Sequence, residues 1–129
     1  MLTRDAILNK VDTQIVIVKV PEWGGDVRVR GMTGEERDAF EGSIVTVKDG
    51  KSTVDTKNIR AKLIAHCVVD EKSDPMFSLE DIPALGKKSA AALQRIFDIA
   101  SKLCGLTEGE VEKIVKNLPP IQSEGSTSD

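Results

Sequence analysis

Residues 15–30 read Ile-Val-Ile-Val-Lys-Val-Pro-Glu-Trp-Gly-Gly-Asp-Val-Arg-Val-Arg, and they predict the centre of the fold. The first six residues form a β-branched run that Pro21 ends, which is typical of a strand. Residues 26–30 alternate apolar and basic side chains, as a half-buried strand does. The five residues between the two runs include a pair of glycines, which favours a tight connection. We therefore predict a β-hairpin, and helices must cover its apolar face because an isolated hairpin is only marginally stable.

Capping residues and apolar spacing predict helices on both sides of this hairpin. Residues 3–12 are expected to form a short helix with Thr3 as its N-cap. Thr33 and Glu36 have the spacing of a capping box, which predicts the start of a second helix. The apolar residues that follow it at helical spacing are Phe40, Ile44 and Val47. The polar residues 48–56 contain an Asp-Gly turn signal and are expected to form a loop.

Further helices are predicted in the second half of the chain. An apolar stripe from Asn58 to Val68 predicts one of them, although Cys67-Val68-Val69 is also compatible with a strand. Ser78 begins a sequence that resembles a capping box and is expected to start a one-turn helix. The longest helix is expected from about Leu85 to Leu103, with Gly105 as its stop signal.

The last predicted helix follows a capping box at Thr107 and ends near Leu118, before two prolines. Residues 119–129 are polar and rich in serine, so we expect a disordered tail.

These elements predict a small α+β fold in which an N-terminal β-hairpin packs on a mainly helical domain of about four helices. Residues 1–118 are expected to form a single domain, and residues 119–129 lie outside it as the tail. The expected core residues are Val16, Val18, Val27, Val29, Phe40, Ile44, Leu63, Cys67, Leu93, Ile96, Phe97, Ala100, Val111, Ile114 and Leu118.

Composition excludes several classes of protein. The 129 residues carry a formal net charge of −3, and only 3% are aromatic, which argues against a nucleic-acid-binding module. No apolar run approaches the roughly 20 residues that a membrane span requires. Two cysteines cannot build a disulfide framework, and the N-terminus lacks the basic-then-apolar order of a secretory signal. A soluble cytoplasmic protein without nucleic-acid or membrane partners is expected.

Residues that could support catalysis are few. His66, Cys67 and Cys104 supply too few strong ligands for a zinc site, and neighbours on a helix point about 100° apart, so His66 cannot pair with Cys67 as a nucleophile. Both cysteines lie on apolar stripes, which favours packing over reactivity. The glycines match neither a phosphate-binding loop nor a dinucleotide fingerprint. We expect no catalytic, cofactor-binding or metal-binding residues, and therefore no enzyme.

Trp23 is the most informative single residue. In the hairpin turn its indole either folds back to cover the small core or projects outward as a partner anchor, a common role for exposed tryptophan. Arg28 and Arg30 could add a basic rim beside it on the outer face of the hairpin, although a solvated strand face explains them equally well. Trp23, Arg28 and Arg30 are the candidate partner contacts.

The order of motifs resembles the tail assembly chaperones of long-tailed bacteriophages over about residues 1–118. The motifs that carry the resemblance are Val20-Pro21-Glu22-Trp23-Gly24-Gly25, residues 29–38, Val68-Val69-Asp70-Glu71, Pro75-Met76-Phe77, residues 85–93 and Leu103-Cys104-Gly105-Leu106-Thr107. Cys104 stands where these proteins often carry a polar residue.

The resemblance implies a non-enzymatic protein that coats the aggregation-prone tape measure protein in the host cytoplasm. Such proteins also recruit tail tube subunits and leave before the virion is complete. Many copies would be needed on a long client, so a homo-oligomer is expected. The alternative is a minor structural or connector protein that stays in the virion.

Overall fold

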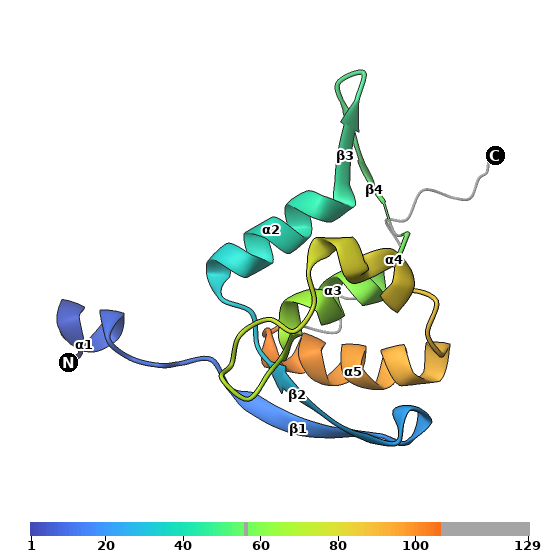
Figure 1. Cartoon of the computed structure of the whole chain (residues 1–129). Coiled ribbons are helices and arrows are strands. Elements are labelled where there is room, and N and C mark those ends of the chain that lie inside the picture. The colour runs from blue at the N-terminus through green and yellow to red at the C-terminus, as the bar shows by residue number, and fades with distance from the viewer. Residues whose placement is uncertain (56, 107–129) are drawn as a thin grey trace.

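The computed structural model describes residues 1–55 and 57–106, and it confirms an α+β fold (Figure 1). One sheet contains β1 (Ile15–Val20), β2 (Gly25–Arg30) and β5 (Val68–Val69) in the order β1-β2-β5. A separate two-stranded sheet pairs β3 (Val45–Lys48) with β4 (Lys51–Val54). The helices of the described part are α1 (Arg4–Leu8), α2 (Gly34–Ile44), α3 (Ile59–Cys67), α4 (Ile82–Leu85) and α5 (Ala90–Leu103), with 3₁₀ turns η1 (Pro21–Trp23) and η2 (Leu79–Asp81).

The predicted N-terminal hairpin is present. Strands β1 and β2 pair antiparallel in a register that places Val16 opposite Val29 and Val18 opposite Val27. The connection between them is the η1 turn, which Gly24 closes with a φ of 71°, a conformation that glycine adopts without steric cost. Strand β5 adds to the other edge of β2, so β2 is the central strand and β1 lies at an edge.

Helix α5 lies between the hairpin sheet and α3. It contacts β1 and β2 on one side and α3 on the other, and α2 and α4 then pack against α3 (Figure 1). The apolar face of α5 supplies Leu93, Ile96 and Phe97 to the core, and Ser89 caps its first turn by accepting a hydrogen bond from the Ala92 amide. The core therefore forms where α5 covers the inner face of the sheet.

Helix α2 begins at the predicted capping box. The Thr33 hydroxyl accepts from the Glu36 amide, and the Glu36 carboxylate accepts from the Thr33 amide. The helix ends at Ile44, three residues before Val47, so the helical spacing of Val47 was misleading. Val47 instead lies in β3 and is 69% exposed.

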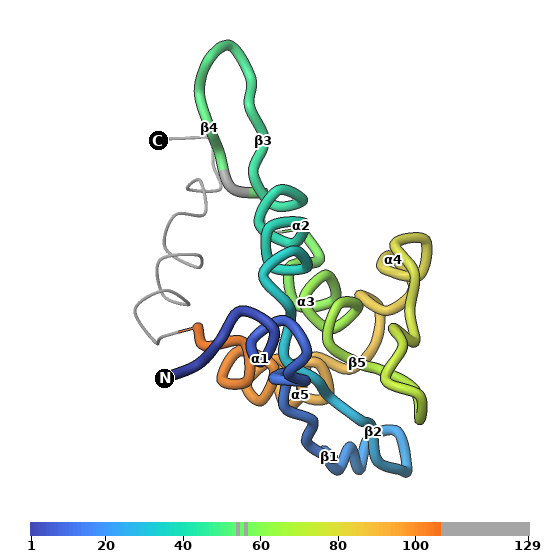
Figure 2. The backbone as a smooth tube through the Cα atoms, turned by 90° about the vertical axis from the view of Figure 1, so that its left-hand side faces the viewer, coloured from blue at the N-terminus to red at the C-terminus, as the bar shows by residue number. Residues whose placement is uncertain are grey.

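The expectation of a loop at residues 48–56 was wrong, because most of this segment belongs to the β3–β4 hairpin. Asp49 and Gly50 both adopt positive φ angles, of 54° and 77°, as a two-residue hairpin turn requires. In residues 45–48, valine alternates with threonine and lysine at the period of a strand. Figures 1 and 2 show this hairpin extending away from the helices as an arm beyond the end of α2.

The second half of the chain follows the predicted order with two refinements. Helix α3 ends at Cys67, and Val68–Val69 form the strand that the sequence left open. The long helix expected from about Leu85 to Leu103 begins later, because α5 starts at Ala90 and residues 86–89 separate it from α4. Gly86 follows α4 and lets the Asn58 side chain pack closely, because a Cβ there would collide with it. Gly105 ends α5 with a φ of 73°, as predicted.

Most of the predicted core is confirmed. Val18, Val29, Phe40, Ile44, Leu63, Cys67, Leu93, Ile96, Phe97 and Ala100 are buried, and Val27 is partly buried. Val16 was predicted wrongly and is 38% exposed, because it lies near the start of the edge strand, and burial along this strand begins only at Val18. Val111, Ile114 and Leu118, the helix expected to end near Leu118 and the tail at residues 119–129 lie outside the described residues.

Candidate partner-binding surface

Trp23 lies at the end of the η1 turn, half-buried and packed against the core. The turn is tied to α5 by an ion pair in which Arg95 donates to the Glu22 carboxylate at 3.0 Å. This contact lowers the pKa of Glu22 and raises that of Arg95, because the hydrogen bond favours both charged forms. The indole therefore has one side against the core and the other toward solvent, in a turn that α5 fixes.

Arg28 and Arg30 lie on the outer face of β2 and reach across to the segment after β5. Arg28 donates to the Glu71 carbonyl and Arg30 to the Ser73 carbonyl, each at 3.2 Å. Arg30 also donates to both carboxylate oxygens of Glu36, at 2.8 and 2.6 Å. The side chains of this pair are 14% and 22% exposed, so the bridge is shielded from solvent. Arg30 therefore joins β2, α2 and the segment at residues 70–74.

That segment is itself internally ordered. The Asp70 carboxylate accepts from the backbone amides of Lys72 and Asp74, and Ser73 adopts a positive φ of 67°. The Asp70 amide donates in turn to the Asp74 carbonyl. Such an Asx-type turn holds the carbonyls of Glu71 and Ser73 where the two arginines reach them.

A group of exposed apolar side chains lies in the N-terminal segment of the chain, from α1 to β1. We call it the N-terminal apolar surface; it consists of Leu2, Ile7, Leu8, Val11, Ile15, Val16 and Ile17. Within the described part of the chain, α1 has no buried side chain, and Figure 1 shows it standing away from the helices. The outer edge of β1 pairs with none of the described strands. Open strand edges and exposed apolar side chains are features of protein-binding surfaces.

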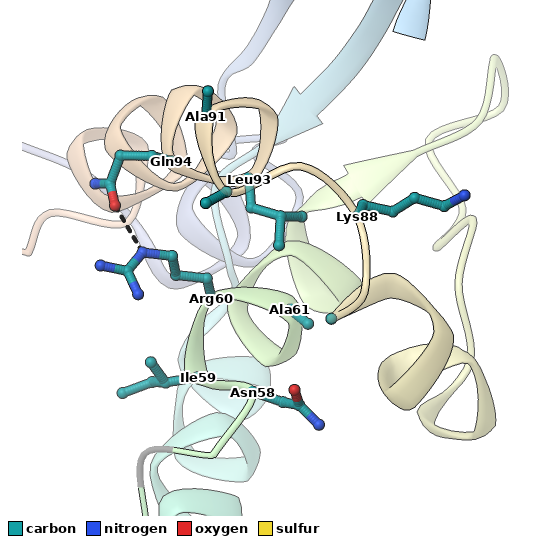
Figure 3. Close-up of a pocket in the computed structure, with 10 residues that line it drawn as sticks. Asn58, Ile59, Arg60, Ala61, Lys88, Ala91, Leu93 and Gln94 are labelled. Atoms are coloured by element: carbon teal, nitrogen blue, oxygen red, sulfur yellow. Dashed lines mark hydrogen bonds between the residues drawn. The ribbon is translucent and has the colours of Figure 1, made fainter. Parts of the chain in front are cut away.

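A second feature is a groove of about 570 Å³ between the first turns of α3 and α5 (Figure 3). Arg60 donates to Gln94 across it at 2.6 Å, and its guanidinium stacks 5.8 Å from the centre of the Phe97 ring. Lys88 and Asn58 line the other end (Figure 3). The groove is open and basic but shows no nucleophile or acid–base pair.

The residues considered for catalysis lie near one another without forming an evident active site. His66 is half-buried and meets the Phe40 ring edge-on, with ring centres 6.2 Å apart. Burial lowers its pKa, because the charged imidazolium is disfavoured away from water. Cys67 and Cys104 approach each other, with their sulfurs 3.7 Å apart. Within residues 1–55 and 57–106, no three His, Cys, Asp or Glu residues are grouped to hold a metal ion.

Reasoning from the sequence placed Trp23, Arg28 and Arg30 on one hairpin. It did not identify the N-terminal apolar surface. The sequence signal that could have revealed this surface was a short capped helix whose apolar face has no other apolar face to pack on, followed by an edge strand. None of the described helices is long and apolar enough to cross a membrane.

Comparison with known proteins identifies the family of the chain. The model of the family described as phage tail assembly chaperone matches residues 3–114, which is most of the chain. Searches of curated proteins and of solved structures gave no match. A family of chaperones indicates a non-catalytic role in assembling phage tail proteins. The chain therefore belongs to the phage tail assembly chaperone family.

Proposed function

We propose that this chaperone binds the tape measure protein of the phage tail and keeps it soluble in the host cytoplasm until tail tube subunits assemble around it. Family membership supports the general role, and the N-terminal apolar surface supports the mode of binding. A long client with exposed apolar helices would aggregate, and an apolar surface on an acidic carrier would shield it.

The observation that carries this proposal is the position of Ile17. It is 55% exposed on the edge strand β1, which follows the equally uncovered α1 along the chain. Trp23 lies on the turn that follows the same strand, and its solvent-facing side extends the proposed contact. Arg28 lies on the same outer face as Ile17, its register partner. We assign these three residues to the client contact, with Arg30 holding the face in shape through Glu36.

Co-expression with the tape measure protein tests the proposal. The chaperone should raise the soluble fraction of the client several-fold and co-purify with it. Ile17→Ser should abolish most of this gain, because it removes exposed apolar area without touching the core. Val47→Ser is the matched control: Val47 is also an exposed β-branched residue in a strand, but it lies on the β3–β4 arm.

Three outcomes would contradict the proposal. The client could remain insoluble with the wild-type chaperone, which would reject the chaperone role toward this client. Equal losses for Ile17→Ser and Val47→Ser would reject the assigned surface. Loss of folding in Ile17→Ser, seen by circular dichroism, would place Ile17 in the core and also reject the surface.

We further propose that the protein leaves before the virion is complete and acts in several copies. Quantitative mass spectrometry of purified particles should detect no stoichiometric amount of it. Stoichiometric presence would favour the alternative, a connector protein retained in the tail. Light scattering of the client complex should give more than one chaperone per client, since one domain cannot cover a long polypeptide.

A further inference from the structure

Two cysteines that are 37 positions apart in the sequence meet at one end of the helical core. Cys67 is the last residue of α3, and Cys104 is the C-cap of α5. Their sulfurs lie 3.7 Å apart, close to van der Waals contact. A disulfide needs about 2.05 Å, so the two sulfurs must approach by only about 1.7 Å. Packing of α3 against α5 holds them at this separation.

The two thiols have different surroundings. Cys67 is fully buried, whereas Cys104 is partly exposed. The backbone amide of Met32 donates a hydrogen bond to the Cys104 sulfur at 3.2 Å. An amide donor stabilises a thiolate more than a thiol, so one sulfur of the pair is both reachable and prepared for ionisation.

We propose that Cys104 and Cys67 form a redox-reactive dithiol, in which a hydroperoxide oxidises Cys104 and Cys67 closes an intramolecular disulfide. Cys104 is the attacking thiol and Cys67 the resolving thiol. This division of roles follows from access, because a peroxide can reach Cys104 from solvent and cannot reach Cys67.

The electrostatic surroundings agree with these roles. Hydrogen bonding from Cys67 and from the Met32 amide, with Arg37 nearby, lowers the pKa of Cys104, against the effects of burial and of Glu36. The contact with Cys104 and burial raise the pKa of Cys67. The pair therefore keeps one proton on the buried sulfur and favours charge on the exposed one.

The reaction balances in two steps. The Cys104 thiolate attacks one peroxide oxygen: the S–O bond forms, the O–O bond breaks, and the departing hydroxide takes a proton to become water. The Cys67 sulfur then attacks the sulfenic acid sulfur: the S–S bond forms, the S–O bond breaks, and the second water carries away the proton of Cys67. Two thiols lose two electrons in total, and one hydrogen peroxide accepts them.

Peptide mapping of the full chain tests the proposal. The reduced protein is treated with hydrogen peroxide at low micromolar protein concentration, its free thiols are blocked, and it is digested with trypsin without reductant. We expect peptides 63–72 and 103–113 to be linked in most molecules, and dithiothreitol should separate them. Disulfides between chains, or Cys104 oxidised to sulfinic acid with Cys67 still free, would overturn the proposal.

Alkylation of the wild-type chain tests the assigned roles without any substitution. In the native protein iodoacetamide should label Cys104 at least about tenfold faster than Cys67, and in urea the two rates should come within about twofold. Equal native rates would refute the division into attacking and resolving thiols.

Two variants complete the test. Cys67→Ala should accumulate sulfenic acid at Cys104 that dimedone traps, and this adduct should be at least tenfold less abundant in the wild type, where Cys67 removes the intermediate. Cys104→Ala is the control and should give no adduct at Cys67. An equal adduct in wild type and Cys67→Ala would show that Cys67 does not resolve the intermediate. If either variant does not fold, the wild-type mapping decides alone.

Discussion

Gly31→Ala is the substitution whose effect can be worked out most directly from the geometry. Gly31 follows β2, and its amide donates to the Gln14 carbonyl at 3.1 Å, which fixes one side of the residue. On its other side, an added Cβ would lie 2.7 Å from the Leu103 carbonyl oxygen and 3.2 Å from the carbonyl carbon. Both obstructing atoms belong to the backbone of the last turn of α5, so no side chain can rotate away.

The cost follows from this contact. Ordinary van der Waals contact begins near 3.4 Å, so the end of α5 must move by several tenths of an ångström. Overpacking of this kind costs about 1–3 kcal/mol. Alanine recovers about 0.4–1 kcal/mol by restricting the unfolded chain. We therefore expect Gly31→Ala to lower the free energy of unfolding by about 1–2 kcal/mol and the melting temperature by roughly 4–10 °C.

Urea unfolding measures the change, with the fluorescence of the single tryptophan, Trp23, as the probe. Gly25→Ala is the matched control, because Gly25 begins the same strand and a Cβ there would meet no atom within 4 Å. The control should change the free energy of unfolding by less than about 0.5 kcal/mol. If Gly31→Ala is as stable as Gly25→Ala, α5 does not approach the end of β2 as closely as described.

Three further predictions follow. Trp23→Ala should lower the free energy of unfolding by about 1–2 kcal/mol, because the indole is half-buried against the core, and should also weaken client binding; a fully stable variant would place the indole in solvent. A double-mutant cycle of Arg30→Met and Glu36→Gln should give a coupling energy of about 1–2 kcal/mol in urea unfolding, since this bridge is largely shielded; additive effects would contradict it. Stability should fall as the pH drops below about 6.5, because burial lowers the pKa of His66 in the folded state and the unfolded chain then binds more protons. His66→Gln should flatten this part of the profile, and an unchanged slope in the variant would assign it to other groups.

The hairpin and the helix caps could be predicted from sequence because local chemistry determines them. The β-branched run before Pro21 has no good helical alternative, and Thr33 and Glu36 satisfy two orphan amides by themselves. The β3–β4 hairpin was also locally encoded, at Asp49-Gly50, but its polar strands were mistaken for a loop. Without a buried face, a strand resembles a solvated segment in sequence.

Features that depend on tertiary contacts could not be predicted from the sequence. The exposure of Val16 depends on where burial begins along β1, at Val18, which only the packing of other elements on the strand determines. The close packing of Asn58 on Gly86 joins the N-cap of α3 to the C-cap of α4. The role of Arg30 depends on Glu36 and Ser73, and the latter lies 43 positions away. The same holds for the contact between Cys67 and Cys104.

The central place of β2 has a consequence for how the chain is synthesised. Its partner β1 precedes it directly, so the first hairpin can pair as soon as residue 30 has left the ribosome. Its other partner, β5, is made long afterwards. The Glu71 carbonyl that Arg28 reaches lies 43 positions later in the chain and is also made late. During this interval Val29 and the second edge of β2 remain uncovered on the nascent chain. Slow elongation between these points would therefore prolong the period in which two nascent chaperones on one messenger could pair with each other.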